Sequence, residues 1–275
     1  MFKNIGALQK TDRISEISAN FFKVMSVFDL GLNDMHFKVV SSALECLQGI
    51  ISALPQQFKR HLERILPTIF LKLTDPKSLV RNLAGIVLET IGENFTGDDL
   101  FPVLLKVCDV SNMKILLGCL EYMHHILPQS VMYFSHASHM RQCIMKLNTL
   151  ATSAKKGDTG NLCQKATMAL FILLYKLNRA MFLEQIVFLP KAQQYSVKHL
   201  LKGRIANLEH DLAEISRMYG NMSGISNTSL DRSDSMEADY EEGLTPTRRS
   251  HRRDYTDESE RYEENFREFE HNAKS

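Results

Sequence analysis

The sequence predicts an all-α protein, an α-solenoid of stacked HEAT-like helix pairs followed by a disordered tail. No segment shows the polar–apolar alternation, with a period of two, that a half-buried strand requires. Glycine and proline fall between apolar runs of helical length. Near residue 220 branched apolar residues give way to Ser, Asp, Glu, Arg and Asn, which cannot bury enough surface to order themselves. We therefore expect a helical domain over residues 1–219 and a disordered acidic and Ser-rich tail over 220–275.

Apolar periodicity predicts the helices one by one. Three pairs come first, with helices over 11–30 and 36–53, over 57–73 and 77–94, and over 98–108 and 112–127. A longer helix then covers 131–154 and leads through KKGDTG, a solvated connector, into a helix over 161–178. The last elements are a short apolar one over 181–189 and a long helix over 195–218.

The second helices of the pairs resemble one another. The pattern VxxxAxxxL occurs at residues 39–47 and 80–88, and a weaker match begins at Met113. Helix pairs that recur at an interval of about 34 residues, each with an apolar face too wide for a lone hairpin, are typical of an α-solenoid. The alternative is an irregular helical domain in which the Leu/Ile periodicity only marks the core.

Charge is divided unevenly between the two parts of the chain. Residues 1–219 hold 25 Lys/Arg against 18 Asp/Glu, whereas residues 220–275 hold 8 against 14. The helical part is therefore basic, which favours an acidic partner.

Several classes of protein are excluded. The N-terminus is too polar for a secretory signal, and the longest apolar run, residues 168–175, is well short of the roughly 18 residues that a membrane span needs. We expect a soluble intracellular chain with neither a membrane nor a nucleic acid as partner. The five cysteines are scattered without a C-x-x-C pair, as expected of reduced, buried thiols: Cys46, Cys108, Cys119, Cys143 and Cys163.

No motif for catalysis is present. The sequence has no phosphate-binding loop, no G-x-S-x-G and no H-E-x-x-H, so we expect no catalytic residue and no cofactor. His136, His139 and Cys143 share one face of a predicted helix and have the spacing of three zinc ligands. Only His124 or His125, on another helix, offers a fourth ligand. We interpret them as surface histidines and a core cysteine, and we expect no metal.

The turn TDPKSLVR between the second pair's helices carries unexpected cations. Asp75 is predicted as the N-cap and Pro76 as the first helical residue. Lys77 and Arg81 then lie near a helix start, where positive charge opposes the helix dipole. Their retention suggests a binding role. The alternative is that Arg81 pairs with a carboxylate of a neighbouring repeat.

The pattern helix–D-P-K-x-x-V-R–helix resembles the HEAT repeats of TOG domains. The segments CQKATMALFILLY and FLEQIVFLPKAQQYSVKHLLKGRI are similar to the close of the last TOG-like domain of the cytoplasmic linker-associated proteins (CLASPs), in which a helix ending in Tyr leads through an apolar link to a final helix. The resemblance covers about residues 10–206. It departs from the family at Gln164, where the family has Arg, and in the absence of any Trp.

The resemblance implies a flat paddle whose narrow edge, made by the turns inside the helix pairs, faces tubulin. Phe37 would take the place of the family's first-turn Trp. The turns on that edge would present His36, Phe37, Lys38, Lys77, Arg81, Asn112, Lys114, Lys155 and Lys156, with Lys191 and Lys198 near the last turn.

The function that the resemblance implies is microtubule binding without catalysis, in the cytoplasm, on microtubules and on the spindle. The domain would bind tubulin, or dock to microtubule ends or kinetochores through adaptor or kinetochore proteins. The alternative is a HEAT-type scaffold or adaptor that does not bind tubulin. A row of the cations along one edge favours tubulin, whereas their dispersal over both faces favours the scaffold.

Two further patterns lie near the end of the chain. Apolar residues spaced by four and three form a coiled-coil seam, and its second half, Leu208–Tyr219, predicts either self-association or packing on the last repeat. Thr245 begins the sequence TPTR, which fits the S/T-P-x-R/K pattern of cyclin-dependent kinases. Neighbouring arginines could pair with the added phosphate, so Thr245 is a phosphorylation candidate; the alternative is a chance match.

Overall fold

The computed structural model of the chain describes residues 14–153 and 157–223. These residues form α-helices and short 3-10 turns, with no strand among them. The chain divides into two units, 1–227 and 228–275, and all described residues belong to the first. The predicted tail, with Thr245, lies outside the described residues. The prediction of an all-α solenoid is confirmed.

The helices follow the predicted pairs with several breaks. The first two pairs comprise α2 (Ile14–Ala19), α3 (Phe21–Leu32), α4 (Phe37–Ala53), α5 (Pro55–Phe58), the 3-10 turn η1 (Lys59–His61), α6 (Leu62–Lys72) and α7 (Ser78–Asn94). The third pair is α8 (Gly97–Val107) and α9 (Met113–Ile126). The 3-10 turns η2 (Leu127–Gln129) and η3 (Tyr133–Ser135) precede α10 (Ala137–Thr152), α11 (Asp158–Leu177), α12 (Arg179–Val187), α13 (Lys191–Leu201) and α14 (Leu208–Ser223).

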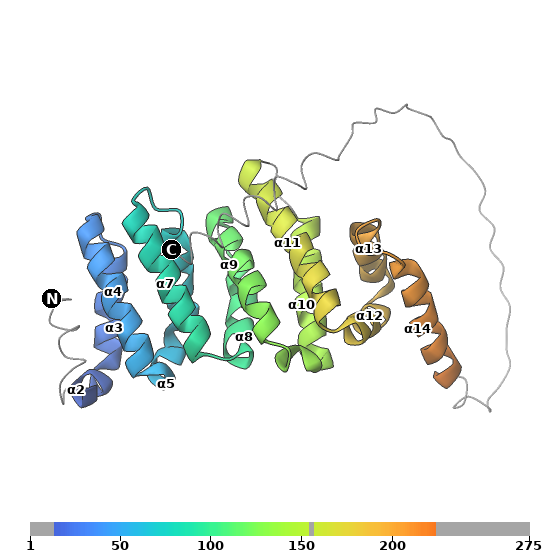
Figure 1. Cartoon of the computed structure of the whole chain (residues 1–275), viewed down its shortest axis with the longest axis horizontal. Coiled ribbons are helices and arrows are strands. Elements are labelled where there is room, and N and C mark those ends of the chain that lie inside the picture. The colour runs from blue at the N-terminus through green and yellow to red at the C-terminus, as the bar shows by residue number, and fades with distance from the viewer. Residues whose placement is uncertain (1–13, 154–156, 224–275) are drawn as a thin grey trace, which may run out of the picture. The chain divides into compact units, whose positions relative to one another are not determined.

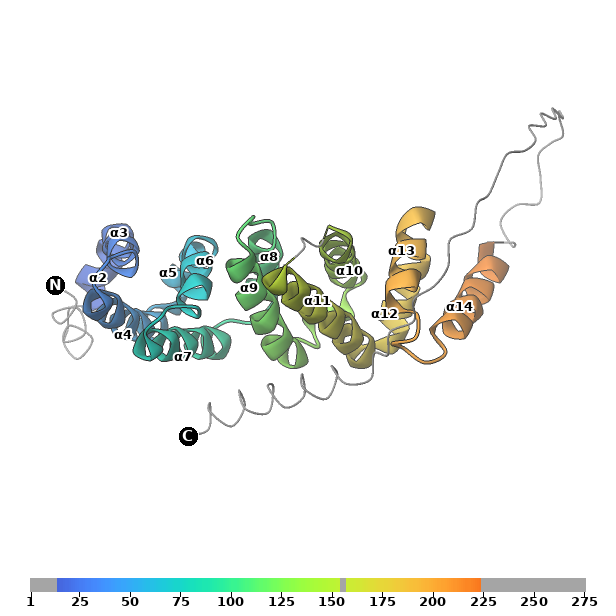
Figure 2. The same cartoon turned by 90° about the horizontal axis from the view of Figure 1, so that it is seen from above.

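The helices of the first unit lie in two rows (Figures 1 and 2). The first helices of the pairs, α3, α6, α8 and α10, form one row, and the second helices, α4, α7, α9 and α11, form the other. Because each second helix enters from the same side, the turns inside the pairs lie along the upper side of Figure 1. Figure 2 looks down on that side.

The second helices share a pattern of buried positions. Their seventh residues are small and fully buried, namely Ala43, Ala84 and Cys119. Their fourteenth residues are all buried isoleucines, namely Ile50, Ile91 and Ile126. The helices begin 41 and 35 residues apart, so the interval is not a constant 34. The third copy of the pattern is therefore centred on Cys119, two residues beyond the position that the sequence match from Met113 indicated.

The predicted long helix over 195–218 is wrong, because the chain breaks after Leu201. Gly203 has φ 76° and Asn207 has φ 60°, both in the left-handed region. Glycine enters that region freely and asparagine more readily than most residues. The break separates α13 from α14. The helix predicted over 131–154 likewise begins only at Ala137, after η3.

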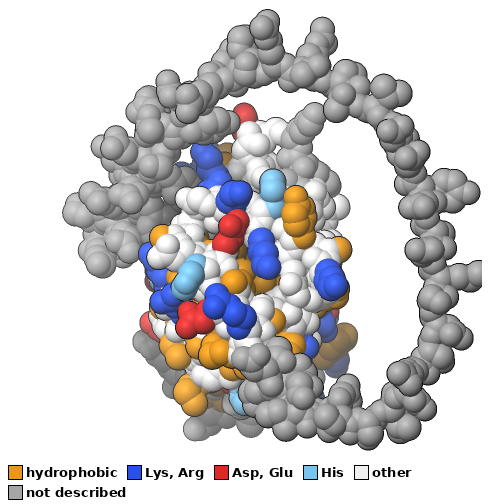
Figure 3. Space-filling view, turned by 90° about the vertical axis from the view of Figure 1, so that its right-hand side faces the viewer, with side chains coloured by type: hydrophobic (Ala, Val, Ile, Leu, Met, Phe, Trp, Pro, Cys, Tyr) orange, Lys and Arg blue, Asp and Glu red, His pale blue; other side chains and the backbone are white. Residues whose placement is uncertain are grey.

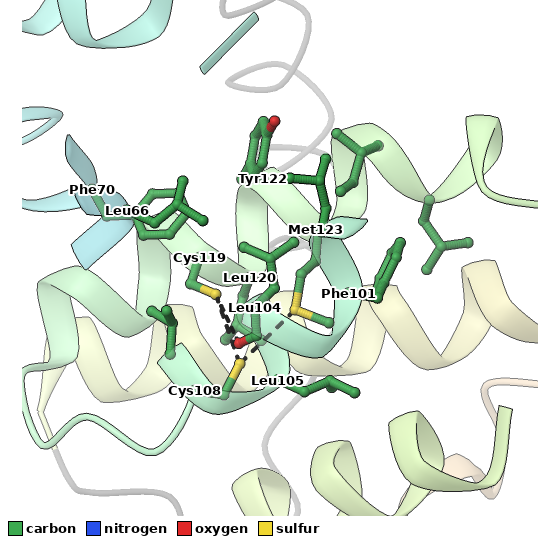
Figure 4. Packing of buried hydrophobic residues seen from close by; sticks show 14 of the residues in the cluster. Leu66, Phe70, Phe101, Leu104, Leu105, Cys108, Cys119, Leu120, Tyr122 and Met123 are labelled. Carbon is green, nitrogen blue, oxygen red and sulfur yellow. Dashed lines mark hydrogen bonds between the residues drawn. The ribbon is translucent and has the colours of Figure 1, made fainter. Parts of the chain in front are cut away.

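Packed aromatic and sulfur-containing side chains fill the space between α6, α8 and α9 (Figure 4). Phe101 stacks on Tyr133 with ring centroids 5.3 Å apart and meets Phe134 edge-on at 4.7 Å. Cys108 lies 3.8 Å from Cys119 between their sulfur atoms. All five cysteines are buried as reduced thiols. Burial raises the pKa of Cys119, so its thiol stays neutral, as the sequence predicted for core thiols.

Polar contacts join successive repeats along each row. In the first row the ion pairs are Arg64–Asp29 at 3.1 Å, Lys106–Glu63 at 2.9 Å and Lys146–Asp109 at 2.6 Å. In the second row the Tyr122 hydroxyl donates to the Leu88 carbonyl at 3.0 Å. The exposed ion pairs contribute little individually, but each of them joins one repeat to the next.

The apolar run at 168–175 lies within α11. Across residues 14–153 and 157–223, no single helix has both the length and the apolar character to cross a membrane; two pairs meet that test only when joined across bends of 113°.

Candidate protein-binding edge

The turns inside the first three helix pairs, 33–36, 73–77 and 108–112, form what we call the turn edge, together with the first turns of α4, α7 and α9. One contact joins the first two of these turns, and a second joins the start of α9 to α11 of the fourth pair. Lys77 Nζ lies over the Phe37 ring, 5.6 Å from its centroid. The Cys163 thiol of α11 donates to the carbonyl of Met113, the first residue of α9, at 3.6 Å.

Each turn is closed by an acidic or amide side chain. Asp34 Oδ1 accepts from the His36 N–H at 2.7 Å, and Asp75 Oδ1 accepts from the Lys77 N–H at 2.9 Å. Asn112 Oδ1 accepts from the Lys114 N–H at 3.0 Å. In all three cases the donor is two residues further on, as in an Asx-turn. At α4 and α7 the accepting side chain lies two residues before the capping residue, whereas at α9 Asn112 is itself the N-cap.

The predicted N-cap of α7 is wrong by two residues. Helix α7 begins at Ser78, and Lys77 rather than Asp75 is the capping residue. Asp75 stabilises the turn before the cap through the Lys77 N–H. The prediction failed because an Asp-Pro pair fits both an N-cap followed by Pro and a turn that precedes the cap.

The two cations of the second turn have different environments. Arg81 Nη1 donates to the carbonyl of Asp75 at 2.8 Å and to that of Pro76 at 3.1 Å, so its guanidinium holds its own turn closed. This contact replaces the carboxylate of a neighbouring repeat that sequence reasoning offered as the alternative. Lys77 instead crosses to the first repeat, where the face of the Phe37 ring attracts its ammonium group.

The remaining predicted residues divide into three groups. Lys38 and Lys114 are the second residues of α4 and α9, so both lie on the turn edge with Lys77. Lys155 and Lys156 lie outside the described residues. Lys198 lies in the last turn of α13, beside the connection 202–207, whereas Lys191 begins α13 and lies at its opposite end.

Sequence reasoning missed two apolar residues of the turn edge. Met35 is fully exposed in the first turn, and Leu79 in the first turn of α7 is 49% exposed. Leu79 precedes the buried pattern of Val80, Ala84 and Leu88, so its position on the helix could have indicated an outward side chain. With Phe37, 37% exposed, these residues place apolar surface among the lysines, as in many protein interfaces.

The histidine and cysteine motif does not form a metal centre in the described residues, where no three His, Cys, Asp or Glu side chains converge. His139 stacks on Tyr133 at 4.0 Å between ring centroids. Cys143 is fully buried, and burial raises its pKa.

The predicted coiled-coil seam faces the protein itself. Leu208 and Leu212 are 3% and 1% exposed. Tyr219 packs edge-on against Phe188 at 5.1 Å, and its hydroxyl donates to Glu184 of α12 at 2.7 Å. These contacts use the residues that self-association would need, so the structure favours the alternative that Leu208–Tyr219 packs on the last repeat.

The fold and the turn edge define a class of protein, an α-solenoid built from HEAT-like helix pairs. No family model matches the sequence. A curated protein, the "CLIP-associated protein" of Arabidopsis thaliana, is 28% identical over 235 residues, which cover 83% of this chain and 16% of that protein. This similarity confirms the resemblance to the CLASP family. The chain spans about a sixth of the length of that relative.

A solved structure is also similar. It comes from work described as "TOG-tubulin binding specificity promotes microtubule dynamics and mitotic spindle formation". The match has a TM-score of 0.49 and 19% sequence identity, and it covers 66% of this chain and 74% of the other. Such a low score supports no conclusion about function.

Proposed function

We propose that this chain is a microtubule-associated binding domain without catalytic activity, which holds tubulin along the turn edge and so favours microtubule growth. The observation that carries the proposal is the placement of Lys38, Lys77 and Lys114 in the first turns of three successive second helices. In the cell the domain would act in the cytoplasm, on microtubules and on the spindle.

The geometry supports an electrostatic mechanism. Three lysines on one edge present positive charge to an acidic surface such as that of tubulin, steering its approach and fixing its orientation. The exposed apolar residues Met35 and Leu79 beside them would add contact area that excludes water. Association should therefore be fast and salt-sensitive, whereas the lifetime of the complex should depend more on the apolar contacts.

A docking role is the second candidate. The edge has no Trp in its first turn, and Phe37 in its place is only 37% exposed, so it offers less aromatic surface than the family pattern. A domain of this kind would serve as a scaffold that joins adaptor or kinetochore proteins to microtubule ends. In that case acidic partners other than tubulin would occupy the turn edge.

The structure indicates which lysines of the turn edge can be changed without disturbing a turn. Changing Arg81 would open its own turn, whereas the side chains of Lys38 and Lys114 make no hydrogen bond or ion pair within the described residues. We therefore compare Lys38→Glu/Lys114→Glu with the control Lys23→Glu/Lys176→Glu. The control makes the same charge change at ends of α3 and α11 that point away from the turn edge.

The two variants are tested by gel filtration with free tubulin and by co-pelleting with microtubules, each at low and moderate salt. The edge variant should weaken binding by about tenfold or more, since each lost contact is replaced by a repulsion. The control should bind as the natural chain does. Equal binding by both variants would remove tubulin from the turn edge, and failure of the natural chain to bind would favour the scaffold.

A further inference from the structure

We propose that one face of α13 is a separate binding site, which takes a short Glu- or Asp-rich segment of a partner protein. This site does not depend on tubulin binding at the turn edge.

The face follows from the helical geometry of α13. Val197 and Leu201 are fully buried and fix the inner side of the helix. Successive residues of a helix are about 100° apart around its axis. On the side turned away from Val197 and Leu201, every charged side chain of α13 and Tyr195 therefore lie within one arc of about 100°. This α13 face consists of Lys191, Tyr195, Lys198, His199 and the capping residue Lys202.

An aromatic pair forms the centre of the α13 face. The Tyr195 side chain is 74% exposed, so burial within the protein does not account for it. Its ring lies 6.3 Å from that of His199 with only 26° between the ring planes. A tyrosine held in this way presents a rigid apolar surface and a hydroxyl at little cost in side-chain entropy, as is common at the centre of protein interfaces.

Acidic residues are absent around this pair in the sequence. No Asp or Glu occurs from Gln185 to Leu208, while four Lys or Arg do. Within the described residues, no carboxylate lies within ion-pair distance of Lys191 or Lys198, and Lys202 reaches Glu209 only at 3.9 Å. Of the flanking acids, Glu184 already accepts from Tyr219. Among the described residues, the charges of Lys191 and Lys198 are therefore not neutralised, and that of Lys202 is only weakly paired.

The space-filling view shows the charged side chains at this end of the first unit. Figure 3 shows Lys and Arg side chains spread over the surface, with histidine and hydrophobic side chains between them and fewer acidic ones. An acidic partner segment is complementary to such a surface.

The dimensions of the α13 face favour a peptide over other anions. The helix has 11 residues and is about 16 Å long, a length that about five extended residues span. Three lysines act as separate point charges, which suit successive carboxylates better than the bidentate contacts that phosphates take from arginine. Neutralising so few phosphates would also give only weak, salt-sensitive binding to a nucleic acid.

The test uses the chain of residues 1–275 and a short fluorescent peptide of alternating Glu and Gly, and binding is measured by fluorescence anisotropy. Lys191→Glu/Lys202→Glu should lower the affinity by about tenfold or more, because two attractions become repulsions. Tyr195→Ala should lower it by roughly three- to tenfold through loss of contact area. Lys23→Glu/Lys176→Glu, with the same charge change on α3 and α11, should leave the affinity unchanged.

Three results would overturn the proposal. One is equal peptide affinity for the α13 variant and the Lys23/Lys176 control. Another is loss of peptide binding in Lys38→Glu/Lys114→Glu, which would place the peptide on the turn edge. The third is binding of a single-stranded DNA oligonucleotide at least as tight as that of the peptide, which would reveal a general anion surface. Circular dichroism confirms that the exposed-site variants remain folded.

Discussion

The turn edge and the α13 face are both cationic, but their cations are engaged differently. On the turn edge Arg81 bonds to two carbonyls and Lys77 lies over Phe37, so part of the charge builds the turns. On the α13 face Lys191 and Lys198 have no acidic partner within the described residues. The buried side chains of Val197 and Leu201 pack α13 against the rest of the protein, so its lysines are not needed for packing.

This difference shows that a cation near a helix start is not by itself a binding residue. Arg81 carried much of the functional argument from sequence, yet its hydrogen bonds give it a structural task. Lys38 and Lys114 lie beside the same turns without such bonds, and they test binding more cleanly. On the α13 face Lys202 lies in the connection to α14, whereas Lys198 lies within the helix and outside any turn.

The largest expected effects come from substitutions in the core, which test whether the two regions rest on separate parts of it. Phe101→Ala removes a fully buried ring of α8 that packs on Tyr133 and Phe134 of η3, between the third pair and α10, and should cost about 3–5 kcal/mol of unfolding free energy. Leu212→Ala, on the buried side of α14, should cost about 2–5 kcal/mol. Hydrogen exchange should show loss of protection in α6–α10 for the first variant and in α12–α14 for the second, because solenoid repeats couple mainly to their neighbours. Identical protection patterns would mean that the two surfaces do not rest on separate cores.

The second largest effect is expected in the connection between α13 and α14. Gly203 has φ 76°, a conformation that costs an L residue about 1–2 kcal/mol. Gly203→Ala should lower the free energy of unfolding by that amount in urea denaturation. Its tubulin binding should stay unchanged, because the turn edge lies in earlier repeats. Reduced tubulin binding in this variant would show that the two regions are coupled.

A pair of alanine variants tests whether Arg81 stabilises the turn edge while Lys114 binds the partner. Arg81→Ala should cost about 1 kcal/mol of stability, since two hydrogen bonds from an exposed charged group are lost. Lys114→Ala should change stability by less than about 0.5 kcal/mol while weakening tubulin binding. Thermal denaturation measures the first effect and gel filtration the second. The comparison fails if Lys114→Ala is the less stable of the two.

The smallest effect is a pH dependence of stability. Burial lowers the pKa of His61, helped by the Arg64 charge, and burial with the neighbouring His125 lowers the pKa of His124. The unfolded chain therefore takes up protons first, so stability is fully present above pH 6.5, the ordinary histidine pKa, and falls as the pH drops below it. His124→Gln should flatten this fall in urea titrations between neutral and mildly acidic pH. An unchanged slope would exclude His124 as a contributor.

Much of the helical order was predictable because it depends on apolar periodicity. The pattern at Ala43 and Ala84 fixes the buried side of α4 and α7, and the sequence shows it directly. The turns were harder, because Asp-Pro at 75 and 76 is compatible with two capping geometries. The break at Gly203 was missed because the apolar seam continues across it from Leu201 to Leu208.

The candidate surfaces were predictable only in part. The positions of Lys38, Lys77 and Lys114 at helix starts followed from pairing the helices correctly. The contact between Lys77 and Phe37 depends on how two repeats stack, which a single sequence does not specify. The α13 face was missed because the long helix predicted over 195–218 merged it with the seam of α14.

The central claim is that the first turns of α4, α7 and α9 together contact tubulin, and site-specific photo-crosslinking tests it most directly. A photoreactive residue is placed singly at Lys38, Lys77 or Lys114, and at Lys23 or Lys176 as controls. Crosslinks to tubulin from all three edge positions and from neither control are the predicted result. Crosslinks of equal yield from the edge and the controls, or from the controls alone, would contradict the account.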